Sequence, residues 1–278
     1  MALDISKIQS RLKDLSSVGN PKTKMLWKPT PGKKVIRIVP NAQTPDNPFV
    51  ELKFHYNLNG KTYLSPDTFN RPDPIVEFSN KMKTTGDKDE WKLGKKLEPK
   101  MRTYAPIIVR GEEDQGVKFW GFGKKVYESI LSVLADPDFG DITDLATGRD
   151  ITIEFKSAEE AGKDYPETTI RVKPNQSPAV DPTRKDLIEK IKNQPNLLDC
   201  WQEHSYDELK SVMNAWLHPV EDEESSTVVG TTYHAGETQD GTETPAVTTP
   251  VVTLAEKKTT PADMENVFDN LFGKKKAE

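Results

Sequence analysis

Apolar residues recur along the chain at the spacings of short strands and helices. Two runs of β-branched and aromatic residues, Thr103–Val109 and Val117–Phe122, flank a polar segment that contains Gly111 and Gly116. This pattern predicts a hairpin with a long loop. The apolar residues that follow are spaced for one face of a helix and predict it at Lys124–Leu134.

A second hairpin is predicted earlier in the chain. Phe49–Leu58 and Lys61–Leu64 flank Asn59-Gly60, a dipeptide that favours a two-residue turn. A short helix is predicted from Ile75 to Met82, fading into the charged run Thr84–Glu90. The other predicted strands are Lys34–Val39, Ile151–Phe155 and Thr168–Val172, and the other predicted helices are residues 4–15, Asp181–Lys192 and Tyr206–Leu217. Together these elements predict an α+β fold with a mainly β core. They suit a small barrel of the oligonucleotide-binding kind, and the pattern alone does not separate it from other α+β folds.

The character of the sequence changes at Glu221. Residues 221–262 are rich in Thr, Ser, Pro and Gly, which predicts a disordered linker. Residues 263–278 then regain an amphipathic pattern, which predicts a short tethered helix that binds a partner. The residues expected to contact that partner are Asp263, Glu265, Val267, Phe268, Asp269, Leu271 and Phe272. The predicted organisation is therefore an arm at residues 1–20, a core at residues 21–220, the linker and this tail.

Charge is distributed unevenly along the 278 residues. Charged side chains make up 30% of the chain, and the formal net charge is -5. The segment 221–278 holds 12 acidic and 5 basic side chains, whereas residues 1–220 hold 34 basic and 32 acidic ones. The acidic average therefore conceals a slightly cationic body, which leaves nucleic acid open as a partner.

The single cysteine, Cys200, excludes an intramolecular disulfide and a zinc site built from several cysteines. No run approaches the roughly 18 consecutive apolar residues of a membrane helix. The amino-terminal residues also lack the apolar core of a secretory signal. These features predict a cytoplasmic protein.

Aromatic and basic residues are interleaved through residues 91–127. Flat rings beside cations suit unpaired nucleic acid, because bases stack on the rings and the cations pair with phosphates. The same pattern also fits an ordinary hairpin whose rings pack in a core and whose lysines cover them. The aromatic residues are Trp91, Tyr104, Phe119, Trp120, Phe122 and Tyr127, and the basic ones are Lys92, Lys95, Lys96, Lys100, Arg102, Lys118, Lys124 and Lys125.

Several segments, taken in order, resemble a known family. The most specific is KFWGFGKKVYESI at Lys118–Ile130, where an aromatic strand runs into a helix. The others are KVIRIVP at residues 34–40, Asn59-Gly60-Lys61 with Tyr63, Thr103–Val109, and GKDYPE at Gly162–Glu167. Over residues 34–180 the chain is thus similar to the single-stranded-DNA-binding, helix-destabilising proteins of T-even-type bacteriophages.

The resemblance implies a fold and a function. The fold is a five-stranded oligonucleotide-binding barrel with added helices. The function is cooperative binding to single-stranded DNA, without sequence specificity, during phage DNA replication, recombination and repair. The implied location is the cytoplasm of the infected bacterial host, and the implied role is binding and not enzymatic catalysis.

The resemblance also implies roles for individual residues. The rings expected to stack on bases are Trp91, Tyr104, Trp120, Tyr165 and Phe69, and the cations expected beside them are Lys100, Arg102, Lys124 and Lys125. Phe119 and Phe122 are expected to face inward, opposite Trp120. Lys7, Arg11 and Lys13 in the arm are expected to contact the next copy of the protein on DNA. The tail is expected to contact replication and recombination proteins and to compete with DNA for the cationic surface.

Members of the resembled family hold a structural zinc with one His and three Cys. His55 lies at the position of the His, but the cysteine positions correspond to Asp67, Asp73 and Val76. A valine side chain offers no ligand, and two aspartates with one His make a weak zinc site. We therefore expect no structural zinc and no other cofactor.

Two other functions fit parts of the sequence. Asp136, Asp138, Asp141 and Asp144 cluster carboxylates, as a metal-dependent nuclease requires, although a solvated loop after a helix fits them as well. The chain could alternatively be a scaffold whose tail binds partners while its core is passive.

Overall fold

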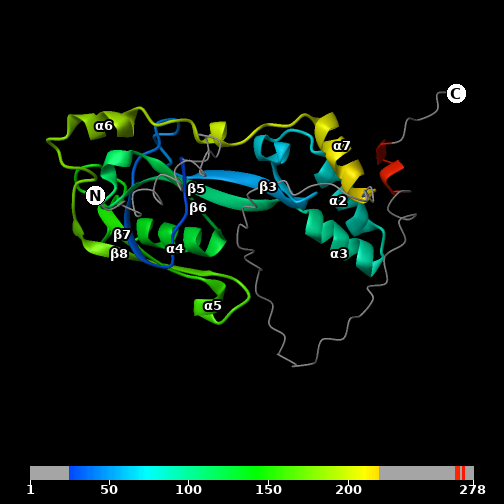
Figure 1. The fold of residues 1–278 in the computed structure, drawn as a ribbon, viewed down its shortest axis with the longest axis horizontal. Helices are drawn as coiled ribbons and strands as arrows, with labels where there is room; N and C mark the ends of the chain where they lie inside the picture. Colours follow the sequence, from blue (N-terminus) through cyan, green and yellow to red (C-terminus); the bar gives the residue numbers. More distant parts are fainter. Residues whose placement is uncertain (1–24, 219–266, 270, 273–278) are drawn as a thin grey trace, which may run out of the picture. The chain divides into compact units, whose positions relative to one another are not determined.

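The described part of the chain divides into two compact units (Figure 1). The computed structural model describes residues 25–218, 267–269 and 271–272. Unit 1 comprises Met1–Glu51 and Arg102–Trp201, and unit 2 comprises Leu52–Met101 and Gln202–Glu278. The predicted arm with Lys7, Arg11 and Lys13, the predicted linker, and the tail residues Asp263 and Glu265 lie outside the described residues.

The described strands form an eight-stranded mixed sheet, and the predicted α+β class is confirmed. Along the order β1-β6-β5-β2-β7-β8, β1 and β6 are parallel and the other neighbours are antiparallel, while β3 pairs with β4 and β5. Hydrogen bonds among these strands do not close the sheet into a barrel. The strands are β1 (Leu26–Trp27), β2 (Gly32–Ile38), β3 (Val50–Leu58), β4 (Lys61–Leu64), β5 (Lys100–Val109), β6 (Lys118–Phe122), β7 (Arg149–Lys156) and β8 (Glu167–Gln176).

Both predicted hairpins are present. β3 and β4 turn at Asn59 and Gly60, whose φ angles of 52° and 70° are the left-handed values that this turn requires. β5 and β6 pair from Thr103↔Phe122 to Ile107↔Lys118. The short strand β1, in a segment without strand-like periodicity, was not predicted.

Unit 1 is built on the central strands of the sheet. The isoleucines of β2 and β7, such as Ile36 and Ile151, are fully buried and pack with Ile107 of β5. Helix α4 (Lys124–Leu134) adds Val126 and Ile130 to this core. The other helices of the unit are α5 (Ala158–Ala161) and α6 (Lys185–Lys192), and the 3-10 turns span Glu113–Gln115 and Leu197–Cys200.

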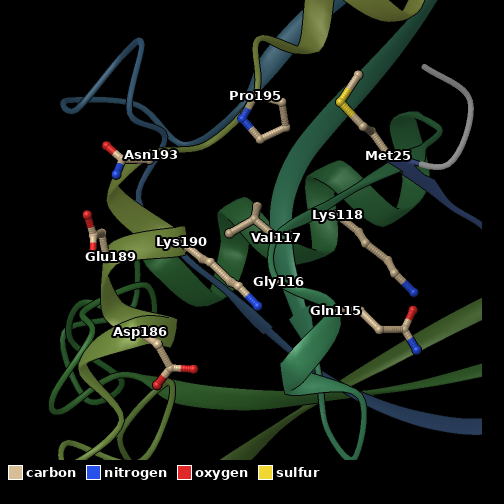
Figure 2. Close-up of a pocket in the computed structure, with 10 residues that line it drawn as sticks. All are labelled: Met25, Gln115, Gly116, Val117, Lys118, Asp186, Glu189, Lys190, Asn193 and Pro195. Carbon is tan, nitrogen blue, oxygen red and sulfur yellow. The ribbon is translucent and has the colours of Figure 1, made fainter. Parts of the chain in front are cut away.

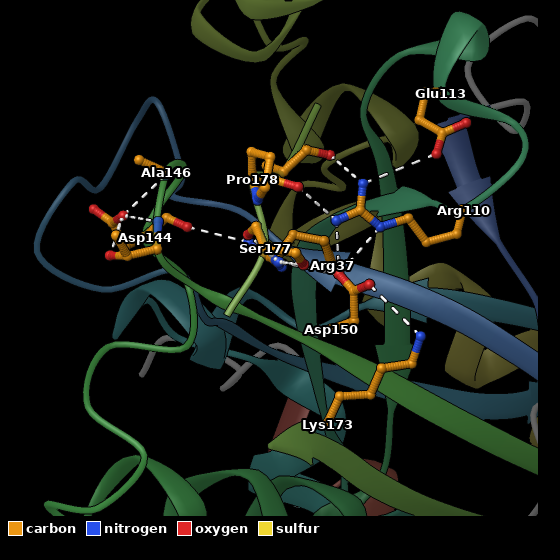
Figure 3. Close-up of polar contacts among 11 residues, drawn as sticks. Arg37, Arg110, Glu113, Asp144, Ala146, Asp150, Lys173, Ser177 and Pro178 are labelled. Atoms are coloured by element: carbon orange, nitrogen blue, oxygen red, sulfur yellow. Dashed lines mark hydrogen bonds and ion pairs between the residues drawn. The ribbon is translucent and has the colours of Figure 1, made fainter. Parts of the chain in front are cut away.

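A buried polar cluster fastens the strands of unit 1 together. Figure 3 shows Arg37 and Arg110 converging on Asp150, with closest ion-pair distances of 3.1 Å and 2.7 Å. Arg37 is fully buried and also donates to the Ser177 carbonyl oxygen at 2.5 Å. Lys173 lies 3.8 Å from the same Asp150 carboxylate. Removing the aspartate would leave buried guanidinium charge without a counter-ion, so this cluster is structural.

The described residues of unit 2 include β4, most of β3 and the helices that pack on them. The helices are α2 (Pro74–Thr84), α3 (Lys88–Leu97) and α7 (Tyr206–Leu217), and a 3-10 turn spans Pro66–Phe69. Its core joins Phe78 and Met82 of α2 to Leu209 and Met213 of α7. Among the described residues, none of the helices combines the length and apolarity needed to cross a membrane.

Helix α3 was not predicted. Its sequence KDEWKLGKKL has few apolar residues, and Lys88–Glu90 was assigned to a charged run. The overlooked signal was Asp87, whose side chain accepts hydrogen bonds from the backbone N–H groups of Asp89 and Glu90 and caps the helix. As a result, Trp91 lies on a helix.

Candidate nucleic-acid interface

Two of the rings predicted to stack on bases are exposed, and each lies beside a lysine. Trp91 in α3 is 47% exposed, and Lys95 Nζ lies 5.7 Å from its ring centroid. Tyr165, in the β7–β8 connection of unit 1, is 38% exposed, and Lys163 Nζ lies 5.9 Å from its ring centroid. An exposed ring beside an ammonium group can take a base on its face and a phosphate at its edge.

Phe69 in unit 2 shows a weaker form of the same arrangement. Its ring is half-buried, and the guanidinium carbon of Arg71 lies 4.9 Å from the ring centroid. Arg71 is also paired with Glu203 at 2.6 Å. A phosphate would therefore have to compete with this carboxylate, as it would with Glu98 at Lys95 and with Glu167 at Lys163. The half-buried ring is what makes this arrangement weaker.

Trp120 lies in the core of unit 1, not at its surface. It is 1% exposed and packs edge-on against Trp27 of β1, with ring centroids 6.1 Å apart. Phe122 lies on the same face of β6, its centroid 4.6 Å from that of Trp120, while Phe119 on the other face is also fully buried. Strand β6 is thus covered on both faces, and the expectation that Trp120 faces outward was wrong. The expectation that Phe122 lies on the opposite face from Trp120 was also wrong, whereas Phe119 does lie on that opposite face.

Around Tyr165, several lysines gather near one glutamate; we call this the Tyr165 cluster. Lys163 Nζ donates to Glu167 Oε1 at 3.0 Å. This hydrogen bond and the charges of Lys163, Lys156 and Lys125 lower the pKa of Glu167. Because α4 packs against β8, Lys125 of α4 and Lys156 of β7 join the same neighbourhood. Lys156 was not among the predicted site residues.

The first turn of α4 adds two exposed cations, Lys124 and Lys125. Cations are unfavourable at the positive end of a helix, and the first turn contains no acidic residue. Gly123, the N-cap, has no side chain with which to bond the free backbone N–H groups. Lys124 has Glu128 as a loose partner at 3.8 Å, both side chains being largely exposed. This helix end is therefore suited to an anion.

A second group of residues in unit 1 lies at the β5–β6 pair of strands; we call Arg102, Tyr104, Lys28 and Trp201 the Arg102 cluster. Arg102 donates to the carbonyl oxygen of Gly121 at 2.7 Å. Tyr104 is 8% exposed, and its ring meets that of Trp201 edge-on, with centroids 5.0 Å apart. Burial and the charge of Arg102 both lower the pKa of Lys28, which places two cations close together.

Sequence reasoning had missed Lys28 and Trp201. No local pattern marks either one, because each reaches the cluster from a segment far from β5 and β6. Lys100, at the start of β5 in unit 2, is exposed as expected.

A wide cavity in unit 1, about 700 Å³, lies beside α6 (Figure 2). Lys118, Lys190 and Asp186 line it, but their charges are already engaged. Lys118 pairs with Glu112 at 3.1 Å, Lys190 donates to the Asp114 carbonyl, and Asp186 pairs with Arg184. The side chains that line the cavity carry charges of both signs and already have partners within the protein. Such a surface does not suit a phosphate backbone, so we do not include this cavity in the interface.

The residues at the resembled zinc positions do not fit a metal. Asp73 Oδ2 lies 2.9 Å from His55 Nε2 and accepts from Ser65 Oγ at 2.5 Å, while its Oδ1 accepts from the Ile75 and Val76 N–H groups. Burial alone would raise the pKa of Asp73, but these hydrogen bonds and the His55 ring lower it. Every acceptor on this carboxylate is therefore occupied.

The carboxylates considered for a nuclease shape a loop. Asp141 accepts hydrogen bonds from Thr143, and Asp144 accepts them from Ala146 and Thr147, as is usual for aspartates in turns. Across the ranges that the structure describes, no three His, Cys, Asp or Glu side chains gather in an arrangement suited to a metal ion.

Comparison with known proteins assigns the chain to one family. The family model described as "gp32 DNA binding protein like" matches residues 30–217. This range runs from the segment before β2 to the end of α7 and includes the Tyr165 cluster and all of the Arg102 cluster except Lys28. No curated protein matches the chain.

Proposed function

Because the chain belongs to the gp32 DNA-binding-protein-like family, we propose that it coats single-stranded DNA without sequence specificity. The family implies single-stranded DNA as the partner. The finer proposal is that the protein protects this strand during phage DNA replication, recombination and repair in the cytoplasm of the infected host. It includes the oligonucleotide-binding architecture, with the sheet of unit 1 as its frame.

One observation carries the binding mode: the exposed aromatic rings among the described residues have lysines beside them. Trp91 with Lys95 and Tyr165 with Lys163 combine a stacking face with a phosphate partner. Stacking tolerates any base because every base has a π face, and phosphate contacts carry no sequence information. This arrangement supports binding that is strong on single strands and indifferent to sequence.

We assign different roles to the residues of the interface. Tyr165 and Trp91 stack on bases, and Lys124, Lys125, Lys156 and Lys163 contact phosphates next to Tyr165. Arg102, Lys28, Tyr104 and Trp201 form a second contact, while Phe69 and Lys100 contribute from unit 2. Trp120 supports the sheet from inside and makes no DNA contact.

Cooperativity and protein partners also belong to this proposal. We infer that the arm, through Lys7, Arg11 and Lys13, contacts a neighbouring copy on the strand. We infer further that the tail contacts replication and recombination proteins. These assignments rest on the resemblance and on the charge pattern of the sequence.

Titration of intrinsic tryptophan fluorescence with poly-dT, at low and high salt, tests the proposal. We expect quenching by poly-dT that salt reverses, and little quenching by duplex DNA of equal length. Trp91→Phe should reduce the quenching, with Trp201 of the second contact accounting for the remainder, whereas Trp120→Phe should leave it intact because its ring is enclosed. Absence of quenching in the unmodified protein at low salt would contradict stacking. Full quenching in Trp91→Phe would show that Trp91 does not stack on bases, without contradicting stacking by other rings.

A further inference from the structure

The carboxyl-terminal helical residues pack on unit 2 of their own chain. We call the described residues Val267–Asp269, Leu271 and Phe272 the C-terminal motif; they are the red segment beside α7 in Figure 1. Phe268 is 9% exposed, and its ring centroid lies 6.4 Å from that of Phe78 in α2. The ring of Phe272 lies 6.4 Å from that of Tyr206 in α7. The motif therefore touches both helices.

A polar contact fixes one end of the motif. Lys210 of α7 donates from Nζ to the carbonyl oxygen of Phe272 at 3.1 Å, and the same Nζ lies 5.1 Å from the Phe272 ring centroid. This hydrogen bond holds the backbone of the motif, and not only its side chains, against α7. The surface thus contacts the backbone of the motif as well as its rings.

The two aromatic residues define the bound face of the motif. Phe268 and Phe272 stand four positions apart, so they lie on one side of a helix, with ring centroids 5.0 Å apart. Val267 packs with them against the core of unit 2. Asp269 and Leu271 point outward, Leu271 being 37% exposed. The docked face is therefore narrower than the apolar face expected from the sequence, which included Leu271.

We infer that α2 and α7 form a binding site for an amphipathic helix with two aromatic residues four positions apart, occupied in cis by the C-terminal motif. Phe268 and Phe272 are among the residues that the tail would offer to a partner protein, and docking covers them. A partner that uses these rings must first displace the motif from α2 and α7. When the C-terminal motif is docked, its two aromatic rings are covered. A partner protein and the surface of α2 and α7 therefore compete for the same rings.

The covalent connection favours the chain's own motif as the occupant. A tethered peptide meets its site at an effective concentration that a free peptide reaches only at about millimolar levels. The binding surface and the motif belong to the same compact unit. The inference does not depend on DNA binding, and its test uses no DNA.

Binding of a fluorescent peptide to the full-length protein tests the inference. The peptide carries residues 261–278, and its anisotropy is measured against the unmodified chain and against Phe268→Ala. We expect the Phe268→Ala chain, whose site is vacated, to bind the peptide about tenfold or more tightly than the unmodified chain, in which the tethered motif competes. A peptide carrying Phe268→Ala should lose binding to the vacated chain, whereas the matched Leu271→Ala peptide should keep it.

One further variant locates the site. Lys210→Ala in the vacated chain should weaken peptide binding, since it removes the bond to the Phe272 carbonyl. Circular dichroism of each variant confirms that the chain is folded. Equal peptide affinity for the unmodified and vacated chains, or equal losses from Phe268→Ala and Leu271→Ala, would overturn the inference. A dimer that Phe268→Ala converts to a monomer, seen by light scattering, would overturn the cis assignment in favour of exchange between copies.

Discussion

His55 Nε2 lies 2.9 Å from Asp73 Oδ2, and both side chains are 1% exposed. The other ring nitrogen of His55 lies 3.1 Å from the carbonyl oxygen of Leu97, and Ser65 donates to the same carboxylate oxygen of Asp73. This cluster joins β3, the start of α2 and the end of α3. Asp73 is also the N-cap of α2, so one carboxylate holds together most of the elements around it.

We predict that Asp73→Ala strongly destabilises unit 2. The substitution leaves His55 and Ser65 buried without their acceptor and removes the cap of α2, which together should cost about 3–5 kcal/mol. Urea unfolding followed by circular dichroism measures the loss. Asp67→Ala is the matched control, because Asp67 pairs with Lys53 at a half-exposed position and should cost about 1 kcal/mol or less. Equal effects of the two substitutions would contradict the central role of Asp73.

Chelators should leave the stability of the protein unchanged. The acceptors of Asp73 are filled by hydrogen bonds, and Val76 has no ligand atom to offer. The measurement is the thermal midpoint of the purified protein with and without a strong zinc chelator. A lower midpoint after chelation, restored by zinc, would show that a metal stabilises the fold.

Lysines of the Tyr165 cluster should contribute to the salt dependence of DNA binding. Lys156→Ala should weaken poly-dT binding and make the slope of log K against log salt shallower by roughly 0.7, the value for one phosphate contact on a single strand. Lys192→Ala, an exposed lysine of α6 outside the cluster, is the control. Tyr165→Ala should instead cost about 1–3 kcal/mol of binding free energy with little change in slope. If both lysine variants behaved alike, the cluster would have no special role.

Gly121 and Tyr104 should be energetically coupled. A methyl group on Gly121 would meet the ring of Tyr104 at about 2.5 Å, which is too close without a shift of the ring. We predict that Gly121→Ala destabilises unit 1 by about 1–3 kcal/mol and weakens DNA binding through the displaced Tyr104 and Trp201. In a double-mutant cycle, Tyr104→Ala should relieve most of the added cost. Simple additivity would show that the clash is absorbed elsewhere.

The stability of unit 1 should depend on the proton of Tyr127. Burial, followed by the hydrogen bond to Glu51, raises the pKa of Tyr127 from 10.0 to about 12. Because the folded state binds this proton more tightly, the stabilisation is complete below pH 10 and is lost as pH rises towards 12. Urea unfolding of the unmodified protein and Tyr127→Phe should therefore differ most at neutral pH and converge at high pH. A constant difference would mean that Tyr127 titrates normally.

Removal of residues 221–278 should tighten binding to single-stranded DNA. The deletion takes away 12 acidic and 5 basic side chains, leaving a body with 34 basic and 32 acidic ones. The affinity gain should be largest at low salt, where charge acts over longer distances. Titration of both proteins at matched salt concentrations measures it. Unchanged affinity would contradict the hypothesis that the tail competes with DNA, but it would not contradict DNA binding itself.

Local patterns in the sequence determined most of the secondary structure. Both hairpins, the Asn59-Gly60 turn and helices such as α4 and α7 follow from apolar periodicity and turn residues, which act between near neighbours in the chain. Trp91 was expected to stack on bases from the residue pattern and from the family resemblance, and Tyr165 from the resemblance alone; both rings are exposed. Helix α3 was missed because its apolar face is sparse, although its cap at Asp87 marks its start.

Only the tertiary structure decided which rings reach the surface. Trp120 and Tyr165 look alike in the sequence as aromatic residues near lysines, yet Trp27 of the unpredicted strand β1 covers Trp120, whereas the ring of Tyr165 stays exposed among the described residues. The gathering of Lys156 with Lys125, and the docking of Phe268 on Phe78, likewise join segments far apart in the chain. Periodicity reports which face of an element is apolar. Burial also depends on what packs against that face, and a distant segment supplies it.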